Sequence, residues 1–336
     1  MKMIMNKRGV LACMAMMAAP WASAEVVQTP TLAADEHETE VEAWVDERHT
    51  QARNWLSRAA HGMDGWFGTP NPDDPARASL RVMMDTTWNR YDGTTIKPRI
   101  RGRLKLPALE ERFSVMIGDE DLDYDRPGDG GYTDERLNTA NDNNRVYDRE
   151  RARDSNASLA LRWSKFRETT GLDVDVGVRT NDLFVRVKGE KKWQLTDDLK
   201  SRFEQVYRYG VSSEHMALTT LEFAKTQTDT QMLVNRSRIL YTNEDNDETI
   251  EWNNSLHRRH DWQGKHGAHE LNYGVYVGGN ISGDAPKLNS YGPYISYRQP
   301  VWRDWLFLQG DAGYYNNKHE DHSHHVTLFG RVEMVF

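Results

Sequence analysis

The feature that most constrains this chain is a two-residue alternation of apolar and polar side chains that persists from residue 78 to the C-terminus. Leu172, Val174, Val176 and Val178, for example, alternate with charged or small residues. Successive side chains of a β-strand point to opposite faces, so this period indicates strands with one apolar and one polar face. We therefore predict an all-β protein built from antiparallel strands.

The alternating segments are separated by connections that are short and long in turn, and the longest spans about 119–154. An even number of strands brings both ends of the sheet to the same side, and we count fourteen, with twelve to sixteen as the range of alternatives. The predicted strands span residues 78–91, 95–106, 111–118, 155–167, 170–180, 182–194, 199–209, 214–226, 229–241, 247–259, 268–280, 290–299, 304–316 and 324–336.

The final strand gives the clearest pattern, because Val332 and Met334 alternate with Arg331 and Glu333 before a terminal Phe336. A closing strand that ends on an aromatic residue resembles the C-terminal strand of bacterial outer-membrane β-barrel proteins. The resemblance implies an antiparallel transmembrane β-barrel surrounded by outer-membrane lipid and lipopolysaccharide. It also implies that Phe336 is part of the signal read by the barrel-assembly machinery, and it identifies no single member of the class.

The N-terminus agrees with export from the cytoplasm. Three basic residues precede a short apolar run (GVLACMAMMAAP) and a small-residue cleavage pattern (ASA), so we expect residues 1–24 to be a signal peptide. Cys13, the only cysteine, falls within it. A mature chain without thiols suits an oxidising periplasm.

Composition narrows the class further. The formal net charge is -8, and loss of the basic signal peptide makes the mature chain more acidic, so nucleic acid is not an expected partner. No apolar run after residue 24 is long enough for a transmembrane helix. The mean hydropathy of -0.80 still suits a barrel, because only alternate residues face lipid. We expect no cofactor.

Residues 38–66 predict one amphipathic helix, with apolar residues three and four positions apart. Trp44, Trp55 and Trp66 are eleven residues apart and return to nearly the same face. We therefore divide the mature chain into a periplasmic helical segment and linker, 25–77, and a barrel, 78–336, with the C-terminus also in the periplasm. The helix could plug the lumen, pack at the periplasmic mouth, lie on the inner leaflet or self-associate; packing at the mouth is favoured.

The sharpest functional feature is a basic row on the second predicted strand. In the segment IKPRIRGRLKL every second residue is cationic, and the residues between are apolar or small. Charge on the lipid face would cost roughly 2–4 kcal/mol per residue near the bilayer midplane, so this row should face the lumen. The basic row consists of Lys97, Arg99, Arg101, Arg103 and Lys105.

Further charges on later strands are predicted to line the same lumen. Opposed basic and acidic walls resemble those of general porins, which implies a channel for small anionic or amphoteric solutes that the basic row would select. The alternative is a closed structural or envelope-associated barrel, whose lumen is filled by ion pairs. The predicted lumen charges are Arg162, Arg186, Lys188, Arg202, Asp173, Asp175, Glu204, Glu222 and Glu251.

Two weaker patterns concern metal binding and catalysis. The segment KHEDHSHH carries His319, His322, His324 and His325, whose imidazoles are a weak candidate for a zinc or copper site. The segment SLHRRHD brings serine, histidine and aspartate together, which leaves a lipid hydrolase as a second alternative. No Gly-x-Ser-x-Gly or His-Glu-x-x-His motif accompanies it, so we expect no enzyme.

Overall fold

The structure of the protein is a computed structural model. The predicted signal peptide, most of the linker and the long 119–154 loop lie outside the residues that it describes. The described residues are 35–67, 75–107, 112–118, 158–179, 182–244, 247–283 and 286–336.

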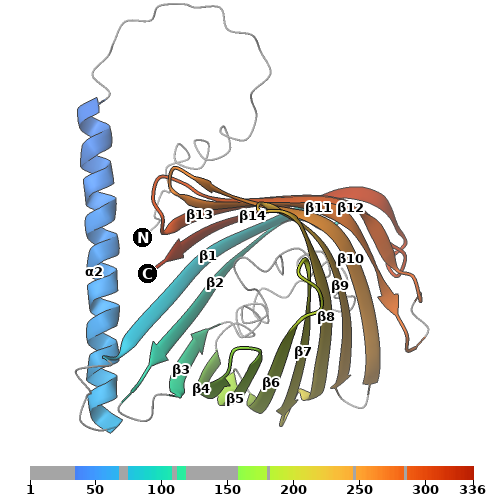
Figure 1. Cartoon of the computed structure of the whole chain (residues 1–336), viewed down its shortest axis with the longest axis horizontal. Coiled ribbons are helices and arrows are strands. Elements are labelled where there is room, and N and C mark those ends of the chain that lie inside the picture. The colour runs from blue at the N-terminus through green and yellow to red at the C-terminus, as the bar shows by residue number, and fades with distance from the viewer. Residues whose placement is uncertain are drawn as a thin grey trace, which may run out of the picture. The chain divides into compact units, whose positions relative to one another are not determined.

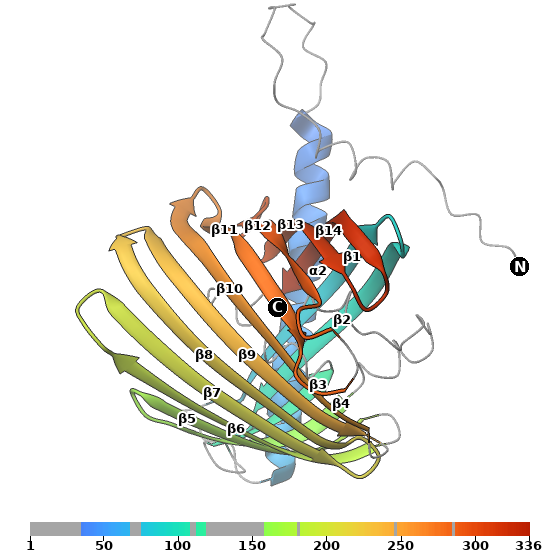
Figure 2. The same cartoon turned by 90° about the vertical axis from the view of Figure 1, so that its right-hand side faces the viewer.

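The strands form one closed antiparallel barrel in which each strand pairs with its neighbours in the sequence, and β1 pairs with β14 (Figure 1). The strands tilt across the barrel wall (Figure 2). They are β1 (Arg77–Asn89), β2 (Gly93–Lys105), β3 (Phe113–Gly118), β4 (Ser158–Phe166), β5 (Thr170–Arg179), β6 (Asp182–Gln194), β7 (Leu199–Gly210), β8 (Glu214–Thr228), β9 (Gln231–Glu244), β10 (Asp247–Gly264), β11 (Gly267–Asn280), β12 (Ser290–Pro300), β13 (Leu306–Asn317) and β14 (His322–Val335).

The seam between β1 and β14 closes the barrel. Asp85 lies opposite Arg331 in an unbroken antiparallel register. The pairing extends past the end of β14, because Leu80 and Phe336 exchange backbone hydrogen bonds of 3.2 and 2.8 Å. Full closure leaves no unpaired sheet edge, which is what allows β-structure to cross a membrane. The predicted fold and the count of fourteen strands are confirmed.

The two faces of the wall differ as the alternation predicted. Exposed apolar residues such as Ile100, Val176 and Val275 cover the outer face of the barrel. Buried charged residues such as Asp175 and Arg186 occupy the alternate positions. The apolar side chains therefore form a belt that suits lipid, and the charges gather in the lumen.

One hairpin of the wall is longer than the sequence predicts. The hairpin of β10 and β11 runs to Gly264, beyond the predicted end at residue 259. There His260 contacts Tyr273 at 3.2 Å, and Trp262 stacks on His269, so aromatic pairing continues the ladder. Val234 is buried on the same face of β9 as Arg236, and β9 pairs with β10 without a shift in register.

The helix α2 (Asp35–Phe67) agrees with the prediction of residues 38–66. Residues up to Arg48 belong to a separate compact unit, whereas the second half of α2, from His49, belongs to the same unit as the barrel. Among the described residues no helix has the length and apolar character needed to cross a bilayer.

The two ends of the barrel differ in their connections. We call the end where β1 begins and β14 ends the terminal rim, and the other end the opposite rim. The described turns of the terminal rim are short, such as the two residues between β8 and β9. The connection from β3 to β4 at the opposite rim is the long one, residues 119–157.

Candidate functional site: the charged lumen

The basic row lies on the lumen side of β2. Arg101 is 7 % exposed, whereas Ile100 beside it is 49 % exposed on the outer face. Alternate residues of a strand are about 6–7 Å apart, so the row sets like charges at that spacing along one strand. Such a row is costly unless carboxylates or anions face it.

The strands that flank β2 supply little negative charge. Asp85 of β1 lies opposite Lys97 in register, and one of its oxygens is 3.6 Å from Arg99. The same carboxylate accepts two hydrogen bonds from Arg331, at 2.6 and 2.7 Å. β3 (FSVMIG) contains no charged residue. Asp85 is therefore the only carboxylate on the two strands paired with β2, and Arg331 already binds it.

The wall of β4 to β6 is balanced instead. Asp175 is 1 % exposed and accepts hydrogen bonds from Arg162 at 2.8 and 2.9 Å. It also accepts from Arg186, whose Nε lies at 2.8 Å. Asp173 accepts a hydrogen bond from Ser164 at 2.6 Å. Each buried carboxylate here has its own donors, so this part of the wall is a closed ionic network.

The network continues across β6 to β9. Lys188 lies 3.1 Å from Glu204, and Arg202 bridges Glu204 and Glu222 at 3.6 and 3.4 Å. Arg236 donates to Glu222 from its Nε at 2.7 Å. Positive and negative charges thus alternate around this part of the lumen.

The structure places the predicted lumen charges on the lumen side, with Glu251 half-buried on the face of β10 that also holds Ser255. Arg202 lies 3.6 and 3.4 Å from Glu204 and Glu222, and Asp173 of β5 lies opposite Lys188 in register. The basic row lies on β2. Several charges that we did not predict complete the network. The alternation already placed them on polar faces, and they are Arg81, Arg236, Arg259, Glu270, Arg298 and Arg331.

A third segment of the wall combines ion pairs with aromatic packing. Arg81 and Arg298 both donate to Glu333, at 2.6 and 3.0 Å. Tyr276 and Tyr315 meet edge to face with ring centroids 5.8 Å apart and are almost fully buried. These side chains are buried on the lumen side of the wall, the ion pairs towards the terminal rim and the tyrosines towards the opposite rim.

The histidine-rich turn does not gather a metal site among the described residues, where no group of three or more metal-ligating side chains converges. His322 stacks on Tyr91 with ring centroids 3.7 Å apart and lies 3.3 Å from Glu320. His324 packs against Tyr291 instead. Hydrogen bonds from Ser323 and from Arg90 hold the pKa of Tyr91 below its ordinary value. The ring stacking of His322 on Tyr91 connects the turn after β1 with the start of β14.

The serine and histidine of the SLHRRHD segment do not form a catalytic pair. Ser255 and His257 are buried on the lumen side, but neither ring nitrogen of His257 has a hydrogen-bond partner. His260 lies on the outer face against Tyr273, and Asp261 pairs with Arg259 at 2.8 Å. A nucleophile needs a base within hydrogen-bond reach, and these four residues diverge.

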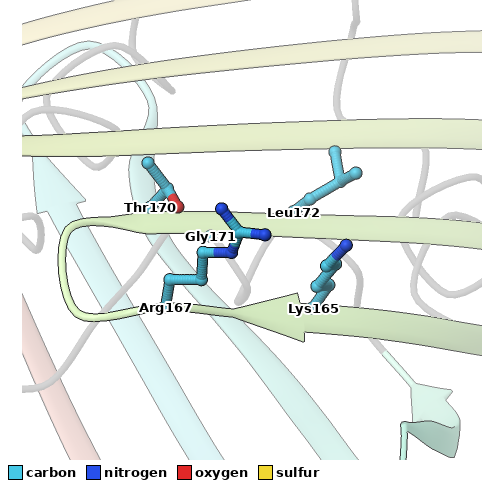
Figure 3. Close-up of a pocket in the computed structure, with 5 residues that line it drawn as sticks. All are labelled: Lys165, Arg167, Thr170, Gly171 and Leu172. Atoms are coloured by element: carbon cyan, nitrogen blue, oxygen red, sulfur yellow. The ribbon is translucent and has the colours of Figure 1, made fainter.

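A surface hollow of about 270 Å³ lies at the turn between β4 and β5 (Figure 3). Lys165 lies opposite Leu172 in register, and both side chains are exposed. The turn belongs to the terminal rim. The hollow is therefore on the outer surface of the barrel, separate from the lumen. It is lined by Lys165, Arg167, Thr170, Gly171 and Leu172.

Together, a closed barrel, an apolar outer belt and a charged lumen define an outer-membrane β-barrel protein. No family model matches the sequence, and no curated protein matches it.

Solved structures with a similar arrangement of strands include OmpT, an outer membrane protein of Vibrio cholerae, at 9% identity. That similarity covers 78% of this chain and 99% of that one, with a TM-score of 0.46. OccK5 (OpdH) of Pseudomonas aeruginosa is 8% identical over 80% and 99% of the two chains, with a TM-score of 0.44. The NanC porin is 7% identical over 75% and 98%, with a TM-score of 0.37.

Proposed function

We propose that this protein is an outer-membrane channel for small anionic or amphoteric solutes, selected by the basic row. The supporting observation is the basic row itself, five cations at alternate positions of β2, with Arg101 buried on the lumen side. Five like charges about 6–7 Å apart along one strand attract anions to that part of the wall.

The mechanism is electrostatic selection without covalent chemistry. A lumen with low-dielectric walls focuses the field of its charges, so anions concentrate at the basic row and cations are repelled. Cations about 6–7 Å apart let an anion move from one to the next without a deep trap. The balanced wall of β4 to β9 supplies the opposite side of the path, where the positive end of an amphoteric solute meets carboxylates such as Glu222.

We further propose that the terminal rim faces the periplasm. Single-chain bacterial barrels have short periplasmic turns and longer outer loops. Here the short turns, the start of β1 and the end of β14 share the terminal rim, and the 119–157 connection is at the opposite rim. Solute would then enter beside that connection and leave beside the second half of α2.

Planar-bilayer recording in a salt gradient tests the channel. The wild-type protein should conduct with a reversal potential of anion-preferring sign, and the double variant Arg99→Gln/Arg101→Gln should shift that potential towards cation preference. Lys165→Gln is the matched control, because it removes an exposed cation of the outer surface. Cation preference in the wild type, or an equal shift in the control, contradicts selection by the basic row.

A closed structural barrel is the second candidate. The observation that favours it is the dense packing of the lumen side, where Arg186, Glu333 and Tyr276 are almost fully buried. This candidate predicts no conductance from folded protein, whether or not α2 is present. Steps of conductance from the wild type would exclude it.

A further inference from the structure

The second half of α2 contacts the barrel only at strand ends of the terminal rim, as far as the described contacts extend. His49 donates a hydrogen bond to the Val335 carbonyl at 2.9 Å and stacks on Trp305 and Phe336, with ring centroids 4.1 and 4.8 Å away. Further along the helix, Ala60 is fully buried in a cluster with the apolar residues that begin β1 and end β2.

These contacts fix the direction of the helix. They pass from β14 across the seam to β1, β2 and Val115 of β3, all at one end of the barrel. The helical path from His49 to Met63 is about 21 Å at 1.5 Å per residue. Four neighbouring strands span roughly 15 Å or more, since adjacent strands lie about 4.8 Å apart. The second half of α2 therefore runs around the rim, across the strands.

A helix in this position has three distinct sides. His49, Ala60 and Met63 form the side that packs on the barrel. Trp55 and Trp66 are 62 % and 80 % exposed. At 100° per residue they lie within about 20° of each other and roughly 100° from the packed side. We call this the tryptophan side.

The remaining side of the helix is polar. Thr50, Asn54, Ser57 and His61 are all exposed, and they lie roughly 90–150° from the packed side in the other direction. Because the helix runs around the rim, its two free sides face opposite ways along the barrel axis. One faces the lipid belt, and the other faces away from it.

The outer wall above the helix is continuous with the lipid belt. Met84 and Ile100 are 46 % and 49 % exposed on β1 and β2, beyond the residues that α2 covers. Elsewhere on the terminal rim, Trp262 stacks on His269 and Tyr297. Aromatic groups on the outer face near strand ends are typical of the level of the lipid headgroups. The helix lies at this same level of the barrel.

We propose that the second half of α2 is an interfacial anchor, with the tryptophan side in the phospholipid headgroup region and the polar side in water. Tryptophan favours the headgroup level because its ring is apolar and its indole N–H donates a hydrogen bond. An amphipathic helix that lies in the plane of the interface buries its apolar side to a shallow depth. The proposal concerns the outside of the barrel, so it stands whether or not the lumen conducts.

Spin labels on single cysteines test it. A Cys13→Ser background removes the only cysteine of the chain. Gly62→Cys places a label between the two tryptophans, where an added Cβ meets nothing within 4 Å, and Ser57→Cys places one on the exposed polar side. In phospholipid vesicles, the measured quantity is the ratio of the collision rate with oxygen to the collision rate with a water-soluble nickel chelate. This ratio should be severalfold higher for the label at position 62 than for the label at position 57. Replacing both tryptophans by serine should reduce this difference.

Other outcomes would overturn the proposal. Equal nickel accessibility at both positions means that the tryptophan side is in water. Dipolar broadening at position 62 that vanishes on dilution with unlabelled protein means that a second copy covers that side. Lipid protection at 57 in place of 62 means that the helix is turned the other way. Barrel folding is scored separately, from the gel shift between unheated and heated protein, so that a misfolded variant is not counted.

Discussion

The ion pairs of Asp175 make a quantitative prediction for stability. Asp175→Asn keeps the size of the side chain and removes the charge that binds two buried arginines. Arg162 and Arg186 are 7 % and 1 % exposed, so neither regains bulk water in the folded barrel. Arg162 donates two hydrogen bonds to Asp175, at 2.8 and 2.9 Å, and Arg186 donates one from its Nε at 2.8 Å.

Removal of one member of a buried ion pair costs about 3–5 kcal/mol, because an uncompensated charge stays buried. Asp175 binds two arginines, so we expect the upper part of that range for the loss in free energy of unfolding. Asp261→Asn is the control. Its carboxylate is 36 % exposed and pairs with Arg259, so its removal should cost about 0–1 kcal/mol after solvent screening.

The assay is reversible urea unfolding in phospholipid vesicles, followed by tryptophan fluorescence, with equal slopes required for comparison. The double variant Asp175→Asn/Arg186→Met should recover part of the loss, since one buried charge is gone. A loss below about 1 kcal/mol for Asp175→Asn would show that water reaches the arginines, and the ion pairs would then be those of an exposed surface.

Two further predictions concern the wall and the helix. Gly274→Ala should prevent folding, because the added Cβ would collide with the Leu256 carbonyl oxygen. Gly330→Ala should fold, because an added Cβ there has open space around it. The gel shift between unheated and heated protein distinguishes the two variants. His49→Ala should weaken the docking of α2 by roughly 1–3 kcal/mol through the lost hydrogen bond and ring stacking. Trypsin should then cut the helix faster while the barrel stays intact, and unchanged cleavage would contradict the contact to Phe336.

The wall of the barrel could be predicted closely because the period of two is a local property of the sequence. Each strand shows its own alternation, and membrane insertion forces the apolar side outward. The error at β10 arose at His260, an outward residue that does not look apolar in a sequence but contacts Tyr273 on the outer face. Val234 shows the reverse case, an apolar residue buried on the lumen side.

The side-chain contacts inside the lumen could be predicted less well from the sequence. Alternation identifies which residues share a face, but pairing across strands depends on register and barrel closure. It therefore gave Asp175 and Arg186 the same side without showing that they bind each other. The contact of His49 with Phe336 had no sequence signal, because it joins segments at opposite ends of the chain.

The seam between β1 and β14 imposes an order on assembly. Every other strand pair joins neighbours along the chain, so hairpins from β1–β2 to β13–β14 can form one after another. The backbone bonds between Leu80 and Phe336 cannot form until β14 is in place. His49 likewise lacks its stacking partners until then. The helix is translated before the first strand, and its contacts with β1 and β2 can form early, but those of His49 form only after β14. Protection of α2 from protease at His49 can therefore report when closure of the barrel is complete.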